Sequence, residues 1–221
     1  MTPTEKSTAI EKEISSTRDA IREKTFWKFT KLSHEEENHP LRKHFNQFPA
    51  LPFTIDENDL LEIQSWSNFP FSHELLDREW TPLEKLFFAQ LWKDGKLRSS
   101  GRIVEGVEQG VKQSNPKVSD AIVYHFFGRH LVNPVSNPII DQHSYRAYKL
   151  IDNEDADSVQ IRKIEKVPSE EEATAYCKWF SEILNAEQID TYRDTRIIDS
   201  YLFALGKFAK MSKKEKEESK P

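Results

Sequence analysis

Apolar residues recur at the three- and four-residue spacing of helices along most of the chain, and alternating strand-like patterns are scarce. In the second half, five segments carry the helical spacing: residues 98–112, 119–132, 142–151, 169–186 and 193–210. In the first half it occurs in TFWKFTKL, in DENDLLEIQSW and in WTPLEKLFFAQLWKDGKL. The last of these begins with a capping Thr81 and a first-turn Pro82 and ends at Gly95. The pattern predicts an all-α protein.

Both ends and one loop lack a strong helical pattern. Residues 1–24 are charged and weakly apolar, so we expect a partly frayed N-terminal segment before the helical domain of residues 25–210. The lysine-rich residues 211–221 are typical of a disordered tail. Within the acidic loop that follows residue 151, SVQIRKI is the one stretch that suggests a short extended piece.

Composition narrows the class of protein. Charged residues make up 31% of the 221 residues and hydrophobic ones 37%, which is typical of helices with solvated outer faces. No apolar run approaches the ~20 residues of a membrane span, and the polar N-terminus lacks a signal-peptide core. We therefore expect a cytoplasmic protein without membrane contact. The single cysteine, Cys177, excludes an internal disulfide and a four-cysteine iron–sulfur site.

Asp141 is the strongest candidate for chemistry. It follows the apolar step Pro138-Ile139-Ile140 and precedes a predicted helix. One interpretation is an N-cap, in which its carboxylate accepts hydrogen bonds from the amides of His143 or Ser144. Another is a catalytic carboxylate, whose charge the helix N-terminus would stabilise. The two roles are compatible, and the sequence leaves both open.

The residues around Asp141 resemble the catalytic region of helix-hairpin-helix DNA glycosylases. The resemblance rests on Gly128, Arg129, His130, Pro138, Ile139, Ile140, Asp141 and Arg146, and more faintly on Thr195–Lys207 as a closing helix. It implies an all-α, two-lobed helix-hairpin-helix glycosylase-like fold. The middle lobe would span about residues 80–138, and the outer lobe would combine 25–79 with 139–210. It further implies that Asp141 is the catalytic carboxylate of a DNA N-glycosylase that needs no cofactor.

The hairpin departs from the family pattern. The turn that should grip a DNA phosphate through glycine amides corresponds to NPKVS, Asn115–Ser119, which has no glycine. Family members that nick the strand use a hairpin lysine, and counting back from Asp141 places Val123 at that position. Counting without gaps from Gly128 reaches Lys117 instead. We favour Val123, which predicts a monofunctional enzyme that leaves an abasic site.

Charge suggests where nucleic acid would bind. The formal net charge is -5, but residues 96–131 hold six basic and three acidic side chains, whereas residues 152–172 hold three basic and eight acidic ones. The expected partner is double-stranded DNA, with an ordinary solvated face as the alternative. The expected contacts to nucleic acid are Lys112, Lys117, Ser119 and Arg129, and those to a flipped base are Tyr124, His125 and His143.

Two alternatives complete the interpretation. His125, His130 and His143 lack the spacing of a metal motif, so we expect no metal site. The rival to an enzyme is a non-catalytic helical nucleic-acid-binding or protein-interaction scaffold that has lost the hairpin glycines. The sequence does not indicate the oligomeric state.

Overall fold

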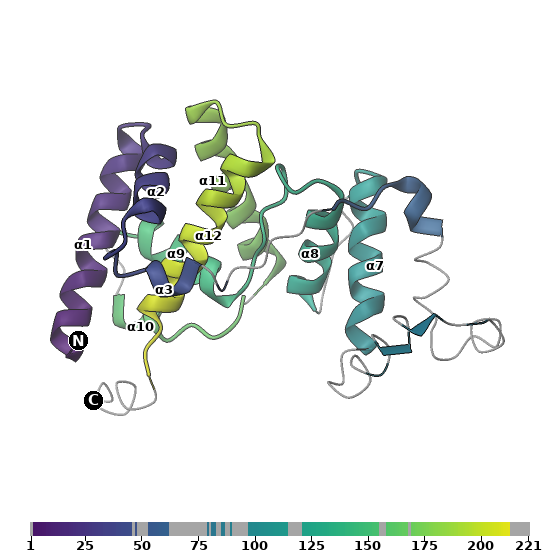
Figure 1. The fold of residues 1–221 in the computed structure, drawn as a ribbon, viewed down its shortest axis with the longest axis horizontal. Coiled ribbons are helices and arrows are strands. Elements are labelled where there is room, and N and C mark those ends of the chain that lie inside the picture. Colours follow the sequence, from purple (N-terminus) through teal and green to yellow (C-terminus); the bar gives the residue numbers. More distant parts are fainter. Residues whose placement is uncertain are drawn as a thin grey trace. The chain divides into compact units, whose positions relative to one another are not determined.

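The regular structure is helical throughout the described part of the chain, as a computed structural model shows (Figure 1). The structure describes residues 2–45, 47, 53–61, 79, 81–82, 85–86, 89, 97–114, 121–154, 158–167 and 169–212. The chain divides into two compact units. Unit 1 comprises Met1–Leu51 and Pro138–Pro221, and unit 2 comprises Pro52–Asn137. The predicted all-α class is confirmed.

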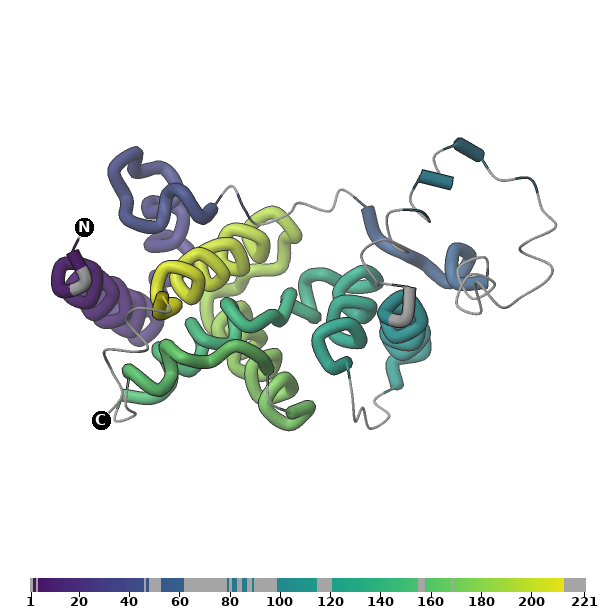
Figure 2. The backbone as a smooth tube through the Cα atoms, turned by 90° about the horizontal axis from the view of Figure 1, so that it is seen from below, coloured from purple at the N-terminus to yellow at the C-terminus, as the bar shows by residue number. Residues whose placement is uncertain are grey.

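Unit 1 is built around its last helix, α12. Its helices are α1 (Pro3–Arg22), α2 (Phe26–Glu35), α3 (Arg42–Phe45), α9 (Gln142–Asp152), α10 (Ser158–Arg162), α11 (Glu170–Glu187) and α12 (Tyr192–Ala209). Helix α12 packs against α9, α2, α3 and α1 (Figure 2). Ile198, Tyr201, Leu202 and Leu205 on α12 are fully buried. Burial on nearly all sides explains why α12 carries the longest apolar stretch of the unit.

The N-terminal segment is a helix where we expected fraying. Thr2 and Glu5 form a reciprocal capping box at the start of α1. Ile10 and Ile14 are buried, and the Thr17 hydroxyl lies 2.7 Å from the Tyr201 hydroxyl of α12. Most charged residues of α1 are exposed and lower the average hydrophobicity of the segment, although Glu13 is buried and accepts a hydrogen bond from Tyr201. Tertiary packing therefore orders residues that looked weak as an isolated helix.

Helix α2 receives its N-terminal cap from a distant part of the chain. The preceding Thr25 makes no side-chain capping bond. Instead, the Phe26 and Trp27 amides each donate a 2.8 Å hydrogen bond to the Glu187 carboxylate at the end of α11. One carboxylate thus satisfies two amides that a helix start leaves open.

The expected extended piece in SVQIRKI is also helical. Ser158–Arg162 form α10, and Ile161 and Arg162 are buried. The Arg162 Nε donates a 3.0 Å hydrogen bond to the Ala209 carbonyl at the end of α12. This long-range contact, together with burial of Ile161, outweighs the β-branched residues that suggested a strand.

Unit 2 contains a close pair of helices, α7 (Leu97–Val111) and α8 (Ile122–Val132). The Gly-basic-His turn that the resemblance places at Gly128–His130 lies inside α8. Gly128 serves packing, because a Cβ there would come within 2.2 Å of the Ile103 carbonyl oxygen of α7. A Cβ at Gly106 would come within 2.1 Å of the His125 carbonyl oxygen. These two glycines let the helix backbones meet.

One boundary between the units lies away from the predicted lobe boundary, and the other lies close to the predicted one at residue 138. Unit 2 begins at Pro52, whereas the middle lobe was expected to begin near residue 80. The Ile55 amide donates a 2.8 Å hydrogen bond to the Leu131 carbonyl of α8, which attaches residues 53–56 to this unit. The hairpin candidate Asn115–Ser119 and the Trp66 region lie outside the described residues, as does most of the predicted helix after Thr81.

Candidate functional site

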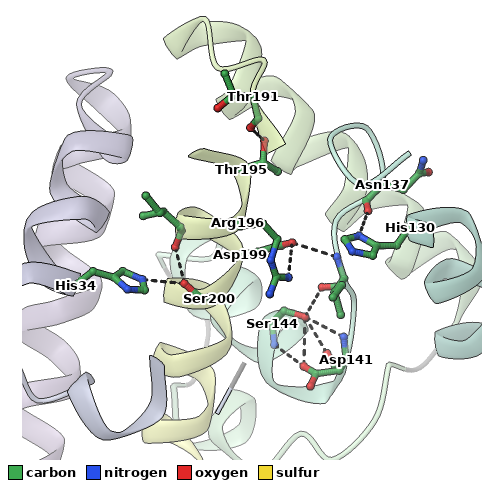
Figure 3. Close-up of polar contacts among 12 residues, drawn as sticks. His34, His130, Asn137, Asp141, Ser144, Thr191, Thr195, Arg196, Asp199 and Ser200 are labelled. Atoms are coloured by element: carbon green, nitrogen blue, oxygen red, sulfur yellow. Dashed lines mark hydrogen bonds and ion pairs between the residues drawn. The ribbon is translucent and has the colours of Figure 1, made fainter. Parts of the chain in front are cut away.

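Asp141 is the N-cap of α9, as its position after an apolar step predicts (Figure 3). Its Oδ1 accepts hydrogen bonds from the His143 amide (2.6 Å) and the Ser144 amide (2.9 Å). The Ser144 hydroxyl in turn accepts a 2.9 Å hydrogen bond from the Asp141 amide. Within the described part of the chain, no donor is bonded to Oδ2, and the residue is partly exposed. One oxygen fixes the carboxylate and the other retains its lone pairs.

The segment before Asp141 is attached to α12 through Asp199. The Ile139 amide donates a 3.4 Å hydrogen bond to Asp199 Oδ2 (Figure 3). Asp199 is only 1% exposed, and its Oδ1 has no hydrogen-bond partner among the described residues. Burial raises the pKa of Asp199 to about 7, against the opposing effects of the Arg196 charge and the Ile139 bond. A buried acid thus lies directly beneath the candidate catalytic segment.

Sequence reasoning missed Asp199. Its one signal is an acid inside the apolar stretch Ile197-Ile198-Asp199, on a helix face that otherwise reads as core. A charged residue at such a position is rarely buried without a specific partner. Its partners are Arg196 one turn earlier, 4.0 Å from Asp199 Oδ2, and the Ile139 backbone, which only the folded chain brings to Asp199.

His143 lies in the first turn of α9 and is partly exposed. The Arg146 Nη1 lies 3.0 Å from His143 Nδ1, and the imidazole meets the Phe203 ring edge-on at 5.2 Å between centroids. Burial lowers the pKa of His143 to about 4, aided by the positive charges of Arg146, Lys207 and Lys210 and opposed by Asp141. Because Arg146 can only donate, Nδ1 accepts, and the neutral ring carries its proton on Nε2.

Arg146, which the resemblance places in the early part of this helix, is completely buried. Its Nη1 donates a 2.6 Å hydrogen bond to the Gly206 carbonyl of α12, and its Nη2 donates to the Ile164 carbonyl. Burial lowers the pKa of Arg146 to about 10. At Gly206 a Cβ would come within 1.8 Å of the His143 carbonyl oxygen. Arg146 and Gly206 together fix the start of α9 against α12.

The candidate residues of unit 2 serve packing instead. His125 is 3% exposed, with Nε2 3.3 Å from a Glu105 carboxylate oxygen, so it is a poor candidate for contact with a base. Arg129 is buried, and its Nε and Nη2 donate to Gln109 Oε1 at 2.9 and 2.7 Å. This geometry does not favour the predicted phosphate contact by Arg129. The sequence could not show these contacts, because the partners Gln109 and Glu105 belong to the preceding helix.

The other predicted residues divide by exposure. Lys112 is exposed and forms an ion pair with Glu108 one turn earlier, and Tyr124 is partly exposed in the first turn of α8. His130 is buried, with Nδ1 2.7 Å from the Asn137 carbonyl oxygen (Figure 3). Lys117 and Ser119 lie outside the described residues. Over the described ranges, no three His, Cys, Asp or Glu side chains are grouped as metal ligands.

Unit 2 also contains a polar groove of about 700 Å³. Gln109, Arg129 and Asn133 contribute to its walls. Gln109 already accepts from Arg129, and Asn133 Oδ1 accepts a 3.1 Å hydrogen bond from the Ser136 amide. These bonds hold the wall together, so the groove alone does not identify a ligand.

Comparison with known proteins does not assign the chain to a family. No family model matches it, and neither a curated protein nor a solved structure matches at a significant level. None of the helices in the described part of the chain is long and apolar enough to cross a membrane. The geometry around Asp141 therefore carries the functional argument.

Proposed function

We propose that the protein is a DNA glycosylase that hydrolyses the N-glycosidic bond of a damaged or modified base, with Asp141 as its catalytic carboxylate. The observation that supports this is that the two oxygens of the Asp141 carboxylate differ in their hydrogen bonding. Oδ1 accepts from two amides of α9, while Oδ2 accepts no hydrogen bond from any described residue. A carboxylate that is held but not saturated can still act on a substrate.

The chemistry requires a fixed negative charge. As the bond between C1′ and the base nitrogen breaks, positive charge develops on the sugar, and an ionised carboxylate stabilises it. A water molecule adds to C1′ and gives one proton to Asp141, while the base departs with the bonding electrons and takes a proton from solvent. The His143 and Ser144 amides and the dipole of α9 point at this carboxylate.

His143 fits an accessory role in this reaction. With Nδ1 held by Arg146, the neutral imidazole presents an Nε2 proton as a donor. Such a donor could bind the substrate or orient the water, as expected from its position two residues after Asp141. The enzyme would be monofunctional, since Val123 in the first turn of α8 has no amine to form a Schiff base.

One observation favours the rival, a non-catalytic helical nucleic-acid-binding or protein-interaction scaffold. Arg129 and His125 stand at the expected functional positions, but their side chains make contacts between α7 and α8. A scaffold in which these two residues serve only helix packing would show the same contacts. The test must therefore address Asp141 directly.

The decisive experiment compares the parent with Asp141→Asn on a panel of duplexes that each contain one altered base. Excision is read as strand cleavage after added alkali. We expect the variant to lose at least about 100-fold in rate, as for removal of one charge-stabilising group. Unfolding should change by about 1 kcal/mol or less, because Asn also caps helices. Asp190→Asn, an exposed acid before α12, is the matched control and should excise normally.

Retained excision by Asp141→Asn would remove the catalytic assignment. Absence of excision by the parent on every duplex, with intact folding, would favour the scaffold. A strand break without alkali would contradict the monofunctional assignment.

A further inference from the structure

Lysines from three helices gather at the C-terminal end of α12. We call Lys6 of α1, Lys43 of α3, and Lys207 and Lys210 at the end of α12 the basic cluster. The Lys6 ammonium donates a 3.0 Å hydrogen bond to the Lys210 carbonyl, and α3 packs directly on α12. Lys43 is exposed, and the other three are partly exposed. Segments far apart in the sequence thus bring four positive charges to one end of unit 1.

The charges of Lys43, Lys207 and Lys210 have no acidic partner within the described part of the chain. Among the described residues, no carboxylate lies within 4.0 Å of the ammonium groups of Lys43, Lys207 or Lys210. The positive charges also affect the pKa of two nearby histidines. Burial is the main cause that lowers the pKa of His143 and of His44, and the charges of Lys207 and its neighbours lower both further. Like charges held close together cost stability, so another benefit should retain them.

Capping of α12 does not account for the whole basic cluster. Cations near a helix C-terminus are favourable, and the last carbonyls of α12 do receive them. The Gly206 carbonyl accepts from Arg146, the Ala209 carbonyl from Arg162, and the Lys210 carbonyl from Lys6. The side chains of Lys43, Lys207 and Lys210 are not among these donors within the described chain. These three lysines therefore carry positive charge that is not bonded to the carbonyls at the end of α12.

The basic cluster lies beside the candidate catalytic carboxylate. The Lys207 ammonium lies over the Phe203 ring, 5.2 Å from its centroid, and the His143 imidazole packs edge-on against the same ring. The His143 amide is bonded to Asp141. Three consecutive contacts within unit 1 therefore connect Lys207 with Asp141. A nucleic acid bound at Lys207 would therefore lie near the Asp141 site.

We propose that the basic cluster is the surface on which the protein binds the phosphate backbone of nucleic acid. It is separate from the predicted contacts Lys112, Lys117 and Arg129, and it presents the ammonium point charges that neutralise phosphates. Four lysines are suited to binding a polyanion. We choose nucleic acid as that polyanion because Asp141 is adjacent, and this choice rests on the proposed function. The interaction is expected to be independent of sequence, because phosphate contacts carry no base information.

The test is a salt titration of the affinity of the full chain for a labelled DNA duplex, comparing two double variants. Lys207→Gln/Lys210→Gln removes two charges from the basic cluster. Lys28→Gln/Lys178→Gln removes two exposed lysines elsewhere in unit 1 and gives the same net charge. The first variant should lose roughly 10- to 100-fold in affinity near 0.1 M salt, and its slope of log affinity against log salt should flatten by about 2. The second should match the parent.

Several outcomes would overturn the proposal. Equal losses in both double variants would indicate a general charge effect, and an unchanged slope in the first would exclude these lysines. Binding to vesicles of anionic lipid but not to duplex would assign the surface to membranes. Nuclear magnetic resonance checks folding and the field together, because Lys207→Gln should raise the pKa of His143 in a folded protein.

The design separates this proposal from the proposed function. Asp141→Asn should bind duplex at least as tightly as the parent, because it removes a negative charge near the phosphates. Binding that depends on Lys207 and Lys210 without any excision would support the surface and reject the enzyme. Excision that depends on Asp141 but is unaffected by the two lysines would support the enzyme and reject the surface.

Discussion

The start of α9 in unit 1 and helix α8 in unit 2 carry the same kinds of residue but use them differently. In α8, Arg129 and His125 contact Gln109 and Glu105 of α7 and are buried. At the start of α9, Asp141 uses one oxygen for capping and keeps the other unbonded within the described chain. The comparison teaches that a polar residue becomes a candidate for function through unused bonding capacity at the surface. Its place in a motif is not enough.

The largest expected effect concerns Asp199 and the pH dependence of stability. The pKa of this buried carboxyl is raised from 3.8 to about 7, so between these values the folded state holds a proton that the unfolded state has released. Stability should therefore fall as pH rises through this range, by on the order of 4 kcal/mol at most. Urea unfolding across the range should show a smaller loss in Asp199→Asn. Parallel curves for variant and parent would contradict this assignment.

Substitution of the packing glycines separates the two regions. Gly206→Ala places a Cβ against the His143 carbonyl, and Gly128→Ala places one against the Ile103 carbonyl. Because backbone cannot yield as a flexible side chain does, each should cost about 3 kcal/mol in thermal unfolding. Only Gly206→Ala should shift the amide resonances of His143 and Ser144. Equal shifts in the two variants would contradict the independence of the α9 site.

Arg129→Met addresses the packing assignment of α8. It removes two charge-assisted hydrogen bonds to Gln109 while keeping most of the apolar contact with Phe126. We expect a loss of about 2 kcal/mol in unfolding free energy. Duplex affinity of the folded protein should not change. A weaker affinity with a flatter salt dependence would restore Arg129 as a phosphate contact.

The smallest effect concerns capping by Asp141. Asp141→Ala removes the side chain that accepts from the His143 and Ser144 amides, and it should cost about 1 kcal/mol more than Asp141→Asn. Denaturant unfolding of both variants measures the difference. A much larger loss in both would reveal a structural role for the carboxylate beyond the cap.

Periodicity predicted the long helices α7, α8, α9, α11 and α12 closely, because each buries an apolar stripe. The N-cap role of Asp141 was also predictable, since the capping bonds are local in sequence. The finer assignment to a two-lobed helix-hairpin-helix glycosylase fold stays a prediction.

What could not be predicted depends on partners far along the chain. Helix α1 is ordered by α12, and the fate of Arg129 depends on Gln109. The bond from Ile139 to Asp199 joins residues from opposite ends of the C-terminal half. Composition and periodicity describe a residue's neighbours in sequence, whereas these outcomes depend on neighbours in space.

The contact between Glu187 and the start of α2 has a consequence for how the protein is made. During synthesis α1 and α2 leave the ribosome first, but Glu187 and the apolar face of α12 follow only after all of residues 52–137. At typical translation speeds, the 160 residues between Trp27 and Glu187 take roughly 8–30 s. Over that time the nascent chain exposes Phe26, which is completely buried in the finished protein. Until α12 follows, the apolar face of α2 lacks the helix it packs against, and such exposed apolar surface is what chaperones bind.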